Sequence, residues 1–100
     1  MIHSYNFDGK KIFEINNNAD KPESFDRVVQ YFKDKKQINV FEYKPPFWNT
    51  GIFKFEIENI NVNLIFRDFG GLELEVKEDL NENELKKVYQ WVDEIYNMEH

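Results

Sequence analysis

Residues 51–77 read GIFKFEIENINVNLIFRDFGGLELEVK, and this stretch decides the fold class of the chain. Apolar side chains alternate with polar or charged ones in three successive runs, which is the period of strands with one buried and one solvated face. Turn-forming residues separate the runs at 59–61 and at Gly70-Gly71. We therefore predict a three-stranded antiparallel meander with one face on the core and the other in water.

Three more strands are predicted before the meander. Asp8-Gly9 lies between two apolar runs, and Asp-Gly in that setting is a strong hairpin signal, so we expect strands at 2–7 and 10–16. Ile38–Tyr43 is a β-branched and aromatic run that ends before Pro45-Pro46, because proline lacks the amide donor of a strand ladder.

Two helices complete the predicted elements. Asp20–Glu23 and Asn81–Glu84 both have the form of a capping box, which satisfies the first free amides of a helix. Apolar residues follow each of them at the 3.6-residue spacing of a helix with one buried face. The core-facing positions are Phe25, Val28, Val29 and Phe32 in the first helix, and Leu85, Val88, Val92 and Ile95 in the second.

The composition is that of a small folded domain with an aromatic core. Of 100 residues, 41% are hydrophobic, and they include ten Phe, five Tyr and two Trp. No Gly-rich or Pro-rich linker divides the chain, so we expect residues 1–100 to form a single domain. The predicted fold class is α+β with the order ββαββββα, a mainly antiparallel sheet with two helices packed on one face.

Charge and cysteine content exclude several classes of function. The chain has no Cys, which rules out disulfides, thiolate metal sites and cysteine nucleophiles. It shows neither a signal-peptide pattern nor a long apolar run, so we expect a cytoplasmic protein that binds no membrane. A formal net charge of -6 is opposite to that of a nucleic-acid binder, so we expect no nucleic acid and a basic partner if any.

Groups suited to catalysis are scarce. The two histidines are His3 and His100, and we interpret His3 as a partly exposed strand residue. Asp68 with Glu75 and Lys77 resembles the acidic-x-Lys arrangement of many restriction-type nucleases, in which carboxylates hold Mg²⁺. The same residues on an alternating strand are ordinary surface charge. We therefore predict no enzymatic activity, no cofactor and no metal site, and keep a metal-dependent hydrolase as the last alternative.

Two features are candidates for binding a partner. Glu56, Glu58, Glu73 and Glu75 are expected on the exposed face of the meander, which makes that face net acidic. It is either a solvated surface that discourages aggregation or a docking surface for a basic partner.

Aromatic residues form the second candidate feature. Phe47 and Trp48 lie in a loop with two prolines, and Trp91 lies on the last helix. Such rings either fold back over the core or project outward as binding anchors.

These features favour a protein-binding module. Charge speeds the association of an acidic domain with a basic effector, and aromatic anchors hold the complex, as in immunity proteins and antitoxins. The partner we expect is therefore a basic protein. The alternatives are a self-associating α+β domain of unassigned role, which forms a homodimer, and an acidic mimic of nucleic acid.

Overall fold

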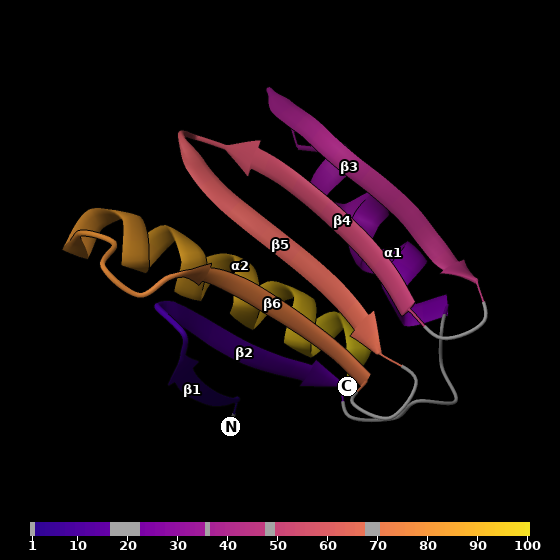
Figure 1. Cartoon of the computed structure of the whole chain (residues 1–100), viewed down its shortest axis with the longest axis horizontal. Coiled ribbons are helices and arrows are strands. Elements are labelled where there is room, and N and C mark those ends of the chain that lie inside the picture. Colours follow the sequence, from indigo (N-terminus) through magenta and orange to yellow (C-terminus); the bar gives the residue numbers. More distant parts are fainter. Residues whose placement is uncertain (1, 17–22, 36, 48–49, 68–70) are drawn as a thin grey trace.

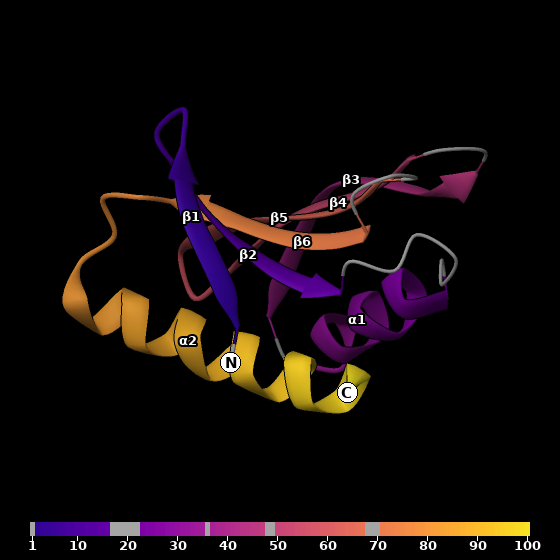
Figure 2. The same cartoon turned by 90° about the horizontal axis from the view of Figure 1, so that it is seen from below.

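The computed structural model describes residues 2–16, 23–35, 37–47, 50–67 and 71–100, without the side chain of Phe47. It confirms an α+β fold with the predicted element order, in which both helices pack on one face of a six-stranded antiparallel sheet (Figures 1 and 2). The strands are β1 His3–Phe7, β2 Lys10–Asn16, β3 Ile38–Phe47, β4 Thr50–Ile57, β5 Ile60–Arg67 and β6 Gly71–Lys77; the helices are α1 Glu23–Lys33 and α2 Glu82–Glu99.

The strand order in the sheet is β1-β2-β6-β5-β4-β3. The meander β4-β5-β6 is as predicted, but the N-terminal hairpin β1-β2 pairs with β6, the last strand of the chain. Between β2 and β3 the chain passes through α1 to the opposite edge of the sheet (Figure 1). The two ends of the chain are thus brought together, because β1 and β2 lie beside β6 and above α2 (Figure 2).

Two tight turns set the register of the hairpins. Asp8 and Gly9 both have positive φ, 54° and 76°, as a two-residue turn that matches strand twist requires, so the predicted first hairpin is confirmed. The turn predicted at 59–61 is instead Glu58-Asn59, with φ of 50° and 66°. Ile60 already belongs to β5, where it pairs with Ile57 and is buried. The one-residue shift keeps this apolar side chain in the core.

Strand β3 is longer than predicted, since it continues through Pro45 and Pro46 to Phe47. It is an edge strand, so one side of its backbone has no neighbour that needs an amide donor. The pairing with β4 is irregular between Lys44 and Phe47, where the prolines lie. Gly51 on β4 permits this close passage, because a Cβ there would lie 3.1 Å from Pro46.

The core lies between the sheet and the two helices. The predicted apolar face of α1 is buried, and in α2 Val88, Val92 and Ile95 are buried while Leu85 is only half-buried. The capping box of α2 is confirmed: the Glu84 amide donates to Asn81 Oδ1 at 2.9 Å, and the Asn81 amide donates to Glu84 Oε1 at 3.1 Å. Most of the capping box predicted for α1 lies outside the described residues.

Among the described residues, side chains of Arg27, Ser24 and Tyr31 on α1 form polar contacts with α2. Arg27 on α1 donates from Nε and Nη2 to the Glu99 carboxylate on α2 at 2.8 and 2.7 Å. Burial raises the pKa of Glu99, but hydrogen bonds from Arg27 and Ser24 outweigh it and hold this pKa below its ordinary value of 4.5. Tyr31 donates its hydroxyl proton to Glu94; burial and then this hydrogen bond raise the pKa of Tyr31 above its ordinary value of 10.0.

A candidate binding cleft on the open face of the sheet

The sheet face opposite the helices is open, and the tip of the β1-β2 hairpin projects beyond it (Figure 2). The amide of Glu78, directly after β6, donates to the carbonyl of Gly9 at 3.1 Å and holds the hairpin turn in place. Between the hairpin and strands β5 and β6 lies a cleft of about 460 Å³. We call this hollow the hairpin cleft; its principal lining residues are Tyr5, Phe7, Lys10, Arg67, Glu73 and Glu75.

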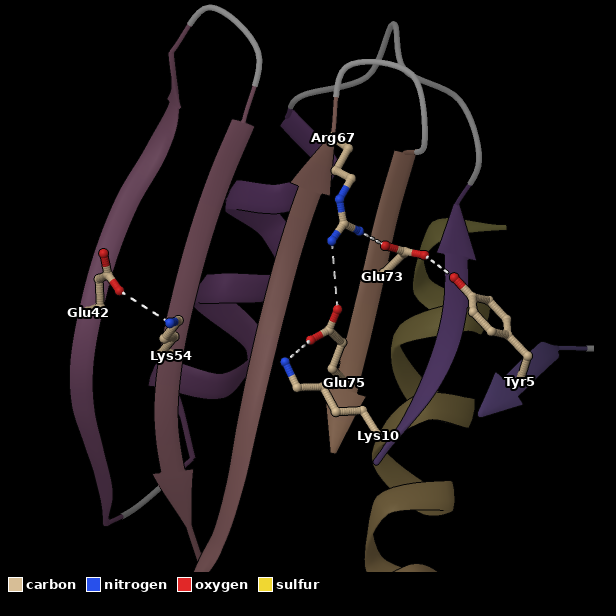
Figure 3. A network of polar contacts seen from close by, with 7 residues as sticks. All are labelled: Tyr5, Lys10, Glu42, Lys54, Arg67, Glu73 and Glu75. Atoms are coloured by element: carbon tan, nitrogen blue, oxygen red, sulfur yellow. Dashed lines mark hydrogen bonds and ion pairs between the residues drawn. The ribbon is translucent and has the colours of Figure 1, made fainter. Parts of the chain in front are cut away.

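Two carboxylates form the floor of the hairpin cleft. Glu73 and Glu75 were expected in solvent, and they do lie on the open face, but they are only 6% and 5% exposed. The predicted exposure was wrong because the β1-β2 hairpin, with Tyr5 and Lys10, and Arg67 of β5 cover these positions of β6. Tyr5 donates its hydroxyl proton to Glu73 Oε2 at 2.9 Å, and Arg67 Nη1 donates to Glu73 Oε1 (Figure 3). Glu73 is therefore paired on both oxygens.

Glu75 is paired much less well (Figure 3). The Lys10 ammonium is 3.5 Å from Oε1, and Arg67 Nη2 is 3.8 Å from Oε2. Both distances exceed those of good hydrogen bonds. Among the described residues Oε1 has no hydrogen-bond partner, although it is buried. A buried acceptor without a hydrogen bond costs about 1–3 kcal/mol, which the ion pair with Lys10 offsets only in part.

The wall of the cleft formed by β1 is aromatic. Tyr5 and Phe7 lie on the same side of β1, because they pair directly with Ile12 and Lys10 of β2. Tyr5 is 38% exposed and Phe7 is 68% exposed. Exposed aromatic rings beside a concave, partly charged surface are typical of protein interfaces. The arrangement can hold a cationic group between carboxylates below and aromatic rings at the side.

Counted over the described strand residues, the open face is not net acidic, contrary to the prediction. Directly paired residues of antiparallel strands share a face, and this assigns five carboxylates and five basic side chains to it. The carboxylates are Glu14, Glu42, Glu56, Glu73 and Glu75, and the basic residues are Lys10, Lys44, Lys54, Arg67 and Lys77. An acidic stretch lies elsewhere, between β6 and the first turn of α2, where Glu78, Asp79, Glu82 and Glu84 follow one another closely.

The other predicted binding residues do not join the cleft. Glu56 accepts a hydrogen bond from Asn39 Nδ2 at 3.2 Å, away from the hairpin. Glu58 lies in the β4-β5 turn, where its Oε1 is 3.3 Å from Lys87 Nζ of α2. The prediction that Glu58 lies on the exposed sheet face was therefore wrong.

The aromatic candidates also lie apart from the cleft. Trp91 is 4% exposed and packs edge-on against Phe32, so it is a core residue and no surface anchor. Phe47 ends β3, where its backbone pairs with Thr50, and Trp48 lies outside the described residues.

Sequence reasoning missed Tyr5, Phe7, Lys10 and Arg67. The available signal was the alternation of aromatic residues along 3–7, which places Tyr5 and Phe7 on one face of a strand. No local pattern indicates that β2 pairs with β6, and without that pairing the hairpin has no neighbour to cover.

Over the described ranges, no three His, Asp or Glu side chains lie close enough together to hold a metal ion. Asp68, the first residue of the nuclease-like hypothesis, lies outside them. None of the described helices is long and apolar enough to cross a membrane. His3 is exposed and pairs with Glu14 at 3.0 Å.

Comparisons with known proteins add no further indication of function. No protein-family model matches the chain, and searches of curated proteins and of solved structures gave no match.

Proposed function

We propose that this chain is a protein-binding module that docks a basic protein on its open sheet face, with the hairpin cleft at the centre. One observation carries the proposal: the cleft combines a floor of two buried carboxylates with exposed aromatic rings on its wall. The poorly paired carboxylate of Glu75 selects a basic group, and aromatic rings supply the contact area that holds a complex. The net charge of -6 steers such a partner toward the chain.

The biological role we propose is neutralisation of a basic effector, as by an immunity protein or antitoxin. A standard interface covers about 800 Å² of each partner, which is enough to block an active site when the domain docks over it. A mimic of nucleic acid needs an acidic face, and the balanced charge of the open sheet face does not support that alternative.

The test is affinity capture from a lysate of the organism that encodes the chain. The bait is the whole chain, at low and at high salt, with two matched variants, Phe7→Ser and Phe41→Ser. Both phenylalanines are exposed, 68% and 65%, but they lie on strands at opposite edges of the sheet. Captured proteins are identified by mass spectrometry, purified, and assayed for an activity that the chain suppresses.

We expect a basic protein that binds at low salt and is released at high salt. Phe7→Ser should abolish capture, Phe41→Ser should preserve it, and the captured protein should lose activity when the chain is added. Capture of no protein would overturn the proposal, and so would a partner that Phe7→Ser binds as tightly as the wild type does.

A second candidate function is self-association through the free edge of β3. Val40 and Phe41 are exposed on this edge strand, and an exposed apolar edge is a template for pairing with another chain. Sedimentation at two concentrations tests it. A dimer that Phe41→Ser dissociates supports this candidate, whereas a monomer at both concentrations contradicts it.

A further inference from the structure

The hydrogen bonding of the cleft floor indicates which chemical group is missing from it. Glu75 is nine-tenths buried and lines the cleft, yet its Oε1 has no hydrogen bond among the described residues. The nearest cation, Lys10, stays 3.5 Å away. A carboxylate oxygen is only an acceptor, so what the floor lacks is a donor.

An anionic ligand does not fit this floor. The positive groups near it, Arg67 and Lys10, are half-exposed at the rim and already face Glu73 and Glu75. An incoming phosphate or carboxylate would compete for these cations and leave two buried negative charges less compensated. An incoming cation instead adds the donors that Glu75 lacks.

The carboxylate floor and aromatic wall of the cleft favour a guanidinium over an ammonium group. A guanidinium is planar, donates in a fork that matches a carboxylate, and stacks on aromatic rings such as Tyr5 and Phe7. Lys10, a point charge on a flexible stem, reaches Glu75 without forming a hydrogen bond. Lys10 and Glu75 also line a second, smaller hollow of about 170 Å³.

We propose that the hairpin cleft is a receptor for an arginine side chain of the partner, and that Lys10 occupies the place of the incoming charge in the free protein. This inference rests on the proposed function and names the group that the partner inserts. The guanidinium displaces the Lys10 ammonium toward solvent and donates to Glu75, while the aliphatic stem of the arginine passes along the aromatic wall of β1.

The probe for this site is capped arginine, N-acetyl-arginine amide, titrated into the isotopically labelled whole chain and followed by the amide NMR spectrum. Capped citrulline is the matched control ligand because it has the same shape without the charge. Glu75→Gln removes the proposed acceptor charge, and Glu56→Gln removes a carboxylate from the same face away from the cleft. Dispersed spectra of each variant establish that it is folded.

We expect saturable shifts for residues of β1, β2 and β6 with capped arginine and none with capped citrulline. Affinity should fall at least tenfold in Glu75→Gln, stay within twofold in Glu56→Gln, and rise severalfold in Lys10→Met. Equal binding of citrulline, unchanged affinity in Glu75→Gln, or shifts confined to α2 would overturn the inference. Binding of inorganic phosphate in place of capped arginine would overturn it as well.

These outcomes separate this inference from the proposed function. If capture depends on Phe7 but capped arginine does not bind, and Glu75→Gln still retains the partner, the module stands and the arginine site is refuted. If capped arginine binds as described but no protein is captured, the arginine site stands and the proposed function is refuted.

Discussion

The carboxylate of Glu75 should destabilise the free protein, and replacing it with methionine should raise stability. Methionine has nearly the same length and shape, and it needs no hydrogen bond in the buried cleft floor. Glu75→Met removes a buried acceptor that has no hydrogen bond from the described residues, which relieves about 1–3 kcal/mol. It also removes two long ion pairs with half-exposed cations, each worth about 0–1 kcal/mol. The net expectation is a gain of about 1 kcal/mol.

The same substitution at the neighbouring carboxylate should act in the opposite direction. Glu73 accepts from both Tyr5 and Arg67, and hydrogen bonds to a charged group contribute about 1.5–3 kcal/mol each. In Glu73→Met, water replaces part of the lost hydrogen bonding at Tyr5 and Arg67, since both side chains remain partly exposed. We expect Glu73→Met to lose about 1 kcal/mol, so the two variants form a matched pair with opposite signs.

Urea unfolding at pH 7, followed by circular dichroism, measures both variants. For a domain of this size, a change of about 1 kcal/mol corresponds to about 4–8 °C in Tm, so thermal melting gives an independent check. Higher stability of Glu75→Met together with loss of partner binding is the pattern expected of a residue kept for function. If Glu75→Met is destabilised as much as Glu73→Met, the view that Glu75 is poorly compensated is wrong.

Three further predictions concern the frame that supports the cleft. Glu99 has a lowered pKa in the folded chain, so its contribution to the free energy of unfolding is fully present above pH 4.5 and is lost as pH falls through the lower folded-state pKa. In urea unfolding from pH 6 to 2, Glu99→Gln should therefore lose less stability than the wild type, and parallel curves would contradict this. Tyr31 has a raised pKa in the folded chain, so the wild type should lose stability as pH rises above 10, while Tyr31→Phe should lose less. Thermal melts at pH 9 and 11 test this, and an equal fall in Tm for both proteins would count against it. Gly51→Ala places a Cβ 3.1 Å from Pro46 and should lower the free energy of unfolding by about 1–3 kcal/mol. An unchanged urea midpoint would show that β3 can move away from the added Cβ without loss of stability.

Local sequence patterns predicted the elements of this fold well, because each depends on neighbouring residues. The alternation in 53–57 is fixed by one strand, and the Asn81 capping box by one helix turn. The β4-β5 turn was displaced by one residue, since the polar run at 58–61 does not reveal that Ile60 is needed in the core.

The cleft could not be predicted in the same way. Glu73 and Glu75 look like ordinary solvent-facing strand residues, and their burial depends on Tyr5 and Lys10, which are distant in sequence. The register of β2 against β6 makes this contact, and it is a tertiary property of the whole sheet. Trp91 failed as a surface candidate for a related reason, because the packing of α1 on α2 decides which side of a broadly apolar helix is covered.

Hydrogen exchange of the backbone amides, with and without the captured partner, tests the docking surface most directly. It reports which segments the partner covers without requiring any substitution. We expect added protection at residues 3–12 and 71–77, which form the hairpin and β6, and unchanged exchange at the exposed turn of 58–59. Protection confined to α2 or to the free edge of β3, with no change in the hairpin, would contradict the assignment of the hairpin cleft as the binding site.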